Sequence, residues 1–232
     1  PSTEPSRSVW AFLRASTEAE ASLARRVKGE QMTEILYEDK YIAVAIKPAG
    51  VLSEGEMPDL LAESLAAIRA ERGEAPPSAI YPVHRLDKET EGLMIYALDA
   101  KAAATLSADI SEGRWEKTYR AWLWGVPEKE SDTLRDLLYY DRARGKSFVV
   151  QRERKGVKAA SLEYQVISHH PDGKRTLVKV KLHTGRTHQI RVQFASRGLS
   201  LCGDRRYGAP AESGKSLALC STELGFTHPK TK

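Results

Sequence analysis

The sequence predicts an α+β fold, in which flanking helices cover a mixed and mostly antiparallel central sheet. Helix patterns occur among the early strands, but the strand patterns between residues 115 and 182 follow one another without a helix between them. Such a run favours antiparallel pairing, because parallel neighbours need long crossover connections. The sequence also contains no Gly-x-Gly-x-x-Gly pattern, so a doubly wound dinucleotide-binding fold is disfavoured.

The ends of the predicted elements are marked by residues with known preferences. Pro58 suits a first helical position and Gly73 a helix end, while Asp99 and Gly113 can begin and end a second helix. Residues 170–173 are expected to form a hairpin turn between two strands. The expected strands are 35–37, 41–46, 93–98, 115–124, 134–140, 148–151, 159–167 and 176–182, and the expected helices are 58–72, 100–112 and 187–196.

Length and composition predict a soluble globular protein. The 232 residues fit one domain, or one domain of two lobes with a tail, and 41% are apolar and 29% charged. No apolar run approaches the ~18 residues of a membrane span. Cys202 and Cys220 have neither metal nor redox spacing, which suggests a reducing compartment. We expect a cytoplasmic monomer that does not contact a membrane.

Positive charge is concentrated in one segment. Residues 1–141 carry 17 Lys/Arg and 25 Asp/Glu, whereas residues 142–206 carry 16 and 4, and residues 207–232 carry 3 and 2. A segment with this excess attracts polyanions through counterion release, and nucleic acid is the commonest such partner. The alternative is a solvated basic face with no ligand.

The first 31 residues differ in character from the rest. They lack the apolar core of a secretory signal, and Glu4, Glu18, Glu20 and Glu30 argue against an organelle transit peptide. A short helix ending near Lys28 is expected. We treat residues 1–31 as an N-terminal extension of unknown role.

The stretch from Val83 to Leu93 is predicted to be a polar loop anchored on a buried strand. Tyr81-Pro82 holds its approach extended, and apolar residues 93–98 follow it. A polar loop on a rigid strand can form an active site. It can also be an ordinary salt-bridged turn, and these residues alone leave both interpretations open.

Two other kinds of site are rejected. Gly145-Lys146-Ser147 and Gly214-Lys215-Ser216 resemble the end of a phosphate-binding loop, but the glycine required five positions earlier is Tyr140 or Ala209. The histidines lack zinc-ligand spacing, so no metal site is expected.

Separated pieces of the chain together carry a more specific signal. They are Lys47-Pro48-Ala49-Gly50, His84-Arg85-Leu86-Asp87 with Thr90 and Gly92-Leu93, Lys117-Thr118-Tyr119, the run from Thr184 to Arg191, and Gly203-Asp204 with Tyr207-Gly208. In this order and at these distances, the chain resembles the RluA family of RNA pseudouridine synthases from Glu34 to Pro229. Glu91 departs from the pattern, because the family usually has Ser there. The resemblance implies a pseudouridine synthase fold with a basic active-site cleft, and a catalytic domain over residues 32–232.

The resemblance also implies a reaction and the residues that carry it. Uracil would leave C1′ of ribose, rotate and rejoin through C5, without a cofactor, in ribosomal or transfer RNA. Asp87 would be the catalytic carboxylate, held charged by a two-pronged ion pair with Arg186, and Tyr119 would pack on the base. Arg85 would fill the place of the flipped uridine, unless it pairs with Glu89 or Glu91. The other residues expected to contact RNA or brace the site are His84, Lys47, Lys117, His188 and Arg191.

Two alternative functions come from other classes. One is a catalytically inactive RNA-binding protein that retains the fold, which would not need the combination of Asp87, Tyr119 and Arg186. The other is an RNA hydrolase that uses His84, Asp87 and His188, for which metal-ligand spacing is missing.

Overall fold

The computed structural model describes residues 33–231, which form two compact units. The first unit contains residues 33–86, Gly92–Glu116 and 223–231, and the second contains Asp87–Glu91 and Lys117–Thr222. The predicted extension over residues 1–31, with its short helix, lies outside the described residues.

The first unit contains a small sheet. Strands β1 (Ile35–Glu38), β2 (Ile42–Lys47) and β4 (Glu91–Ala97) lie in the order β1-β2-β4-β10, with the end of β10 (Leu219–Gly225) beside β4. The short β3 (Tyr81–Pro82) also pairs with β4. The β1–β2, β2–β4 and β3–β4 pairings are antiparallel. Strand β2 is buried on both faces, so helices are needed on both sides of it.

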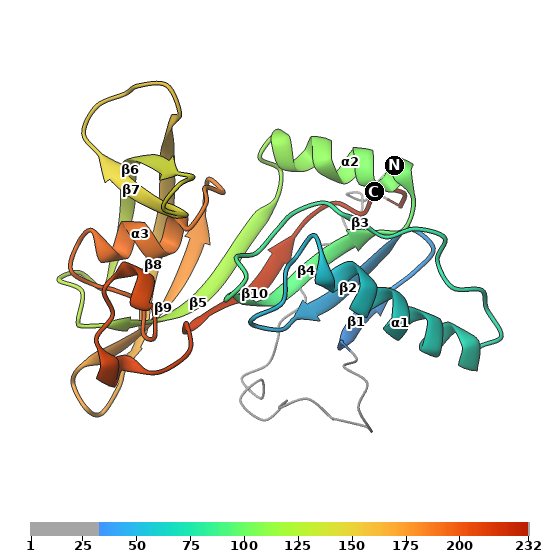
Figure 1. The fold of residues 1–232 in the computed structure, drawn as a ribbon, viewed down its shortest axis with the longest axis horizontal. Coiled ribbons are helices and arrows are strands. Elements are labelled where there is room, and N and C mark those ends of the chain that lie inside the picture. Colours follow the sequence, from blue (N-terminus) through green and yellow to red (C-terminus); the bar gives the residue numbers. More distant parts are fainter. Residues whose placement is uncertain (1–32, 232) are drawn as a thin grey trace, which may run out of the picture. The chain divides into compact units, whose positions relative to one another are not determined.

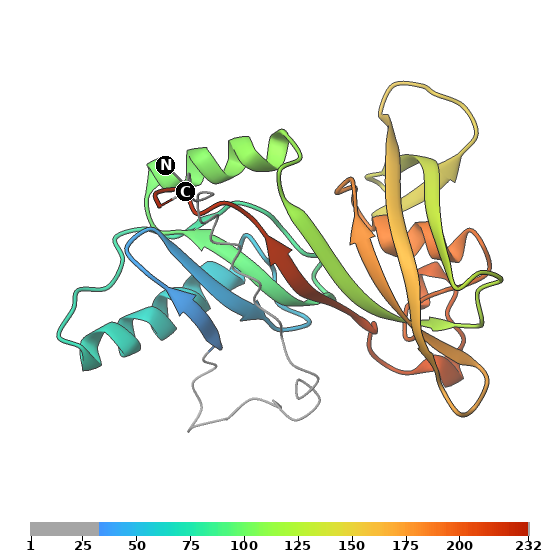
Figure 2. The same cartoon turned by 180° about the vertical axis from the view of Figure 1, so that it is seen from behind.

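Helices α1 (Glu56–Glu71) and α2 (Ala100–Ser111) supply this cover. Figure 1 shows α1 in front of β1 and β2, and Figure 2 shows it behind them. Helix α2 begins at Asp99 as predicted, because the Asp99 carboxylate accepts hydrogen bonds from Lys101 N and Ala102 N at 2.8 and 2.9 Å. Helix α1 begins at Glu56, two residues before Pro58, which is therefore its third residue.

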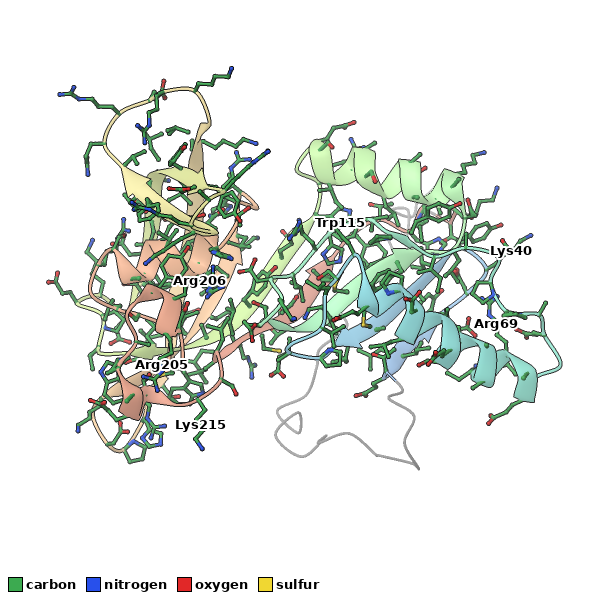
Figure 3. The ribbon with its side chains drawn as sticks, in the orientation of Figure 1. Lys40, Arg69, Trp115, Arg205, Arg206 and Lys215 are labelled. Carbon is green, nitrogen blue, oxygen red and sulfur yellow. The ribbon has the colours of Figure 1, made fainter. Side chains whose placement is uncertain are left out.

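The core between α2 and the sheet is apolar. Ala102 and Leu106 of α2 pack with Ile42, Val44 and other alternating residues of β2 and β4. Trp115, labelled in Figure 3, and Phe226 extend this core, with ring centroids 5.5 Å apart. The period-2 alternation of a strand thus fixes which face of β2 meets α2.

The second unit contains the longer strands. They are β5 (Glu116–Trp124), β6 (Ser131–Asp141), β7 (Lys146–Val150), β8 (Val157–His169) and β9 (Arg175–Leu182). The order is β10-β5-β9-β8-β6-β7, and the pairings from β5 to β7 are all antiparallel. A register shift between Val166 and Ser168 marks a bulge in β8.

Helix α3 (Gln189–Ala195) packs against this second sheet. Val192 lies in a core with Leu138 of β6, Ala160 of β8 and Tyr207. Tyr207 ends a short 3-10 helix, Arg205–Tyr207, and another such turn spans Ala211–Ser213. Because almost every residue of α3 is buried, the side chains at its start are held within the unit.

The predicted α+β class with a mostly antiparallel sheet is confirmed, and each predicted strand and each helix within residues 33–231 has a counterpart. Strand β10 was not predicted. Its sequence, Leu219 to Gly225, mixes Leu, Cys, Ser, Thr and Glu without alternation, because both of its faces contain buried residues. Among residues 33–231, no helix has both the length and the apolar character required to cross a membrane.

Candidate active site

Asp87 stands at the start of a tight turn in the second unit. Its backbone carbonyl accepts a hydrogen bond from Thr90 N at 3.0 Å, and Thr90 is buried. The Asp87 side chain is 21% exposed. A carboxylate on such a turn is fixed in place and remains accessible to a ligand.

Arg191 supplies the positive charge beside Asp87. Its Nη1 lies 3.3 Å from Asp87 Oδ2, although the two residues are 104 positions apart in the sequence. The same guanidinium holds Asp204 with two prongs, from Nε to Oδ2 at 2.7 Å and from Nη2 to Oδ1 at 2.8 Å. Burial opposes the charge, but Asp204 and Asp87 together raise the pKa of Arg191. The cation is therefore permanent, and Asp204 fixes its orientation.

His188 approaches the same Asp87 oxygen from the start of α3. It is the one non-glycine residue with positive φ (54°) in the described chain, and its Nε2 lies 3.8 Å from Asp87 Oδ2. Burial lowers the pKa of His188, and the charges of Arg191 and Arg206 act in the same direction, against those of Asp87 and Asp204. A neutral imidazole therefore faces Asp87 near neutral pH.

Tyr207 determines which nitrogen of His188 carries the proton. The Tyr207 hydroxyl accepts a hydrogen bond from Ser147 N at 2.8 Å and lies 2.9 Å from His188 Nδ1. With Ser147 N–H already donated to the oxygen, the hydroxyl proton is available for Nδ1. This arrangement favours the tautomer in which Nε2–H points at Asp87.

Tyr119 of β5 completes the group of residues around Asp87. It is 7% exposed and pairs in register with Val180 of β9. Burial, followed by the negative charge of Asp87, raises the pKa of Tyr119 well above its ordinary value. The phenol is therefore protonated at physiological pH and can act as a rigid ring or a hydroxyl donor.

Comparison with known proteins identifies the family of the chain. A family model described as RNA pseudouridylate synthase matches residues 41–196. The chain belongs to this RNA pseudouridylate synthase family. The predicted resemblance to RluA-type synthases is confirmed by relatives that share about a third of their residues with the chain.

These pseudouridine synthase relatives extend over most of the chain. It is 34% identical over 198 residues to the dual-specificity RNA pseudouridine synthase RluA of Yersinia pestis, which covers 84% of this chain and 93% of the relative. It is 35% identical over 211 residues to an uncharacterized RNA pseudouridine synthase of Aquifex aeolicus, which covers 84% of this chain. The match spans 65% of the length of that Aquifex relative.

Solved structures of pseudouridylate synthases share the fold. Human RNA Pseudouridylate Synthase Domain Containing 1 has a TM-score of 0.68 at 22% identity, covering 87% of this chain and 80% of its own. The human domain-containing 4 protein has a TM-score of 0.66 at 24% identity, covering 82% and 83%. The predicted pseudouridine synthase fold is thereby confirmed.

The predicted ion pair between Asp87 and Arg186 is wrong. Arg186 Nε instead donates to Ala159 O at 2.9 Å, and its backbone N–H donates to Gln189 Oε1. Arg186 precedes α3, whereas His188 and Arg191 lie three residues apart on one side of that helix. In this protein the guanidinium beside Asp87 thus comes from Arg191.

The residues predicted in the first unit have structural contacts of their own. Lys47 is fully buried and its Nζ donates to Pro48 O and Val51 O at 2.8 Å each. His84 Nε2 accepts a hydrogen bond from Ile95 N at 3.0 Å, and its ring packs edge-on against Trp115. These contacts make both side chains braces of the first unit.

Arg85 and Lys117 differ in exposure. The Arg85 side chain is 67% exposed and lies 3.6 Å from Glu54, so its carboxylate partner is neither Glu89 nor Glu91. An exposed pair of this kind is weak and can exchange for a ligand phosphate. Lys117 lies on β5, where burial lowers its pKa.

Sequence reasoning assigned no role to Asp204, Tyr207 or Ser147. Asp204 and Tyr207 were noted only as parts of the resemblance, and Ser147 belonged to a rejected phosphate loop. The structure shows that Gly203, directly before Asp204, has φ +74° and that a Cβ there would lie 1.8 Å from Ser216 O. This position requires glycine, but no pattern in the sequence alone reveals that constraint. Within residues 33–231, no three His, Cys, Asp or Glu side chains gather as a metal site.

Proposed function

We propose that this protein isomerises specific uridines to pseudouridine in structured RNA, with Asp87 as the catalytic carboxylate and no cofactor. The observation that carries the proposal is the fixed ion pair from Asp204 through Arg191 to Asp87, in a member of the RNA pseudouridylate synthase family. The name of one relative, ribosomal large subunit pseudouridine synthase D, favours ribosomal RNA as a substrate, and the dual-specificity names of others favour more than one RNA target.

The reaction requires that Asp87 stay ionised and in one position. Arg191 contributes a fixed positive charge at 3.3 Å, and the Nε2–H of His188 faces the same Oδ2 at 3.8 Å. Both contacts occupy Oδ2, which leaves Oδ1 for the C1′ side of a bound uridine. Preorganised charges of this kind act without reorganisation during the reaction.

Tyr119 is proposed to pack on the target base and to assist the proton transfer at C5. Its ring is held by β5 and its hydroxyl remains protonated, because its pKa is raised. Arg85 is proposed to take the place of the uridine swung out of its stack, since a guanidinium plane can replace stacking and hydrogen bonds. Its exposed pairing with Glu54 leaves it available for this.

Tritium release from RNA labelled at C5 of uridine tests the reaction. RNA transcribed with this label should release tritium with the parent protein and remain full length. Asp87→Asn should reduce the release at least about 100-fold, as expected when a group that takes part directly in the reaction is lost.

The same assay separates the alternative functions. An RNA-binding protein without catalysis would shift the RNA in a gel and release no tritium. A hydrolase would shorten the RNA. The proposal is contradicted if the parent protein gives either of these results and releases no more tritium than Asp87→Asn.

A further inference from the structure

The second unit contains a basic cavity that the proposed chemistry does not use. It has a volume of about 680 Å³ and lies among β6, β7, the start of β8 and the loop before α3. Its charged lining consists of Arg142, Lys155, Lys158, Arg186 and one carboxylate, Asp141. The lining therefore has an excess of positive charge.

The cations of this cavity have no carboxylate partners within residues 33–231. Arg142, Lys155 and Lys158 form no ion pair there, and the Arg186 guanidinium donates only to the carbonyl of Ala159. Other basic residues of the unit are paired, such as Arg175 with Asp172 at 2.7 Å and Arg197 with Asp136 at 2.9 Å. The single acid of the lining, Asp141, faces Arg144 at 3.6 Å. Unpaired cations around one hollow suit a polyanion.

Aromatic side chains stand beside these cations. Tyr140 lines the cavity and is 39% exposed. Tyr139 also lines it, and the Arg154 guanidinium lies over the Tyr139 ring, 4.6 Å from its centroid. An exposed ring among cations is the combination that holds single-stranded nucleic acid, because bases stack and phosphates pair.

The cavity is adjacent to the candidate active site within the same unit. Tyr140 meets the His188 ring edge-on, with centroids 6.2 Å apart, and His188 Nε2 lies 3.8 Å from Asp87 Oδ2. Ser147 and Thr187 belong to the cavity wall, and Ser147 N donates to the Tyr207 hydroxyl that contacts His188. One side chain therefore separates the cavity from the carboxylate.

We propose that this cavity is a flanking-nucleotide subsite, in which Arg142 and Lys158 bind phosphates of the RNA next to the target uridine and Tyr140 stacks on a neighbouring base. The proposal rests on the proposed function for its ligand, RNA. Only the His188 side chain lies between the cavity and Asp87. The bound phosphates would therefore belong to nucleotides next to the target uridine, not to a remote part of the RNA.

A salt titration of RNA binding tests the subsite without requiring catalysis. The probe is a short fluorescein-labelled oligouridylate, whose affinity is measured between about 50 and 200 mM salt. Arg142→Ala combined with Lys158→Ala removes two contacts. The slope of log affinity against log salt should fall by about 1.4, which corresponds to about 25-fold weaker binding at 0.1 M, since each single-strand phosphate contact contributes ~0.7.

The matched control removes the same charge elsewhere in the second unit. Lys174 and Lys215 are exposed, and Figure 3 shows Lys215 at the end of the unit opposite the β7–β8 loop. Lys174→Ala combined with Lys215→Ala should change the slope by less than half as much. The subsite would be overturned if the two double variants had equal slopes of log affinity against log salt, or if neither slope differed from that of the parent protein. A separate variant, Tyr140→Ala, should weaken binding without changing the slope.

Tritium release distinguishes failure of the subsite from failure of the isomerase proposal. The Arg142 and Lys158 double variant should raise KM and keep turnover at saturating RNA, because neither residue touches Asp87. Loss of turnover at saturating RNA would overturn the subsite as described. A parent protein that releases no tritium but shows the slope difference would leave the subsite standing and remove the isomerase.

Discussion

Two arginines five residues apart have different surroundings in this protein. The Arg186 guanidinium ends on a backbone carbonyl, whereas that of Arg191 lies between two carboxylates and is 5% exposed. In the sequence, both are arginines of the same motif, the run from Thr184 to Arg191, and nothing there shows which of them pairs with Asp87. Which of them meets Asp87 depends on the start of α3, since the helix turns Arg191 and His188 to one side and leaves Arg186 before it.

Arg191→Lys should therefore lower turnover much more than Arg186→Lys. Lysine keeps the charge but cannot hold Asp204 with two prongs and reach Asp87 at the same time. We expect about 100-fold lower kcat for Arg191→Lys and less than about fivefold for Arg186→Lys, by analogy with the loss of one preorganised electrostatic group. Tritium release at saturating RNA measures both. A larger loss of kcat for Arg186→Lys than for Arg191→Lys would instead support the pairing of Asp87 with Arg186 that the sequence predicted.

Tyr207→Phe tests the tautomer of His188. Long-range proton–nitrogen NMR of the parent protein should show His188 protonated on Nε2 and unprotonated on Nδ1. Removing the hydroxyl takes away the donor that stabilises the neutral ring, so the pKa of His188 should rise in the variant. A parent His188 protonated on Nδ1 would contradict the arrangement. Because Ser147 N also loses its acceptor, we expect a loss of stability of about 1–3 kcal/mol.

The lowered pKa of His188 predicts a pH dependence of stability. The folded protein binds this proton less readily than the unfolded chain, whose histidine pKa is about 6.5. The contribution is therefore fully present above about pH 6.5 and is lost as the pH falls toward the lower folded pKa. His188→Asn keeps a residue that tolerates positive φ and removes the titration. Chemical denaturation at several pH values should show the parent losing stability relative to this variant below about pH 6.5.

At the scale of elements, the turn before the short helix Arg205–Tyr207 depends on one glycine. Gly203 has φ +74°, and a Cβ there would lie 1.8 Å from Ser216 O, a backbone atom that cannot move cheaply. Gly203→Ala should destabilise the protein by more than about 3 kcal/mol, through strain and a backbone shift. Gly173→Ala is the control, because Gly173 also has positive φ (67°) but open space around it. We expect about 1 kcal/mol there, measured by urea denaturation.

Most elements were predictable because their signals are local. Asp99 as an N-cap, the hairpin turn at residues 170–173 and the alternation along β5 depend on near neighbours in the chain. Strand β10 was missed because its residues are buried by partners distant in sequence, which a local pattern does not reveal. The predicted start of α1 is two residues late, because proline is tolerated throughout the first helical turn and so Pro58 does not mark the first residue.

The residues around Asp87 were only partly predictable. The resemblance to the RluA family singled out Asp87, Tyr119, His188 and Arg191, and all four lie in the second unit. The pairing of Arg191 with Asp204 and the link from Ser147 through Tyr207 to His188 join segments 13 to 60 positions apart. Such contacts arise from packing of α3 on β6 and β8, and no spacing in the sequence encodes them.

At the scale of the whole molecule, the excess of positive charge in the sequence lies in one of the two units. The basic segment 142–206, with 16 Lys/Arg and 4 Asp/Glu, lies entirely within the second unit, which also contains Asp87. Part of that charge is neutralised by local pairs, such as Arg175 with Asp172. The sequence count therefore overstates the positive charge that a polyanionic ligand would meet.

The second unit obtains its acid from a separate stretch of chain. Asp87–Glu91 is flanked on both sides by first-unit segments, yet its contacts are with residues 117–222. A gene fragment that encodes only residues 117–222 would keep His188, Arg191 and Asp204 but lack Asp87, the carboxylate that we propose to be catalytic. Adding back a synthetic peptide that contains residues 87–91 would then be a complementation experiment, in which Arg191 is the receptor for the peptide carboxylate.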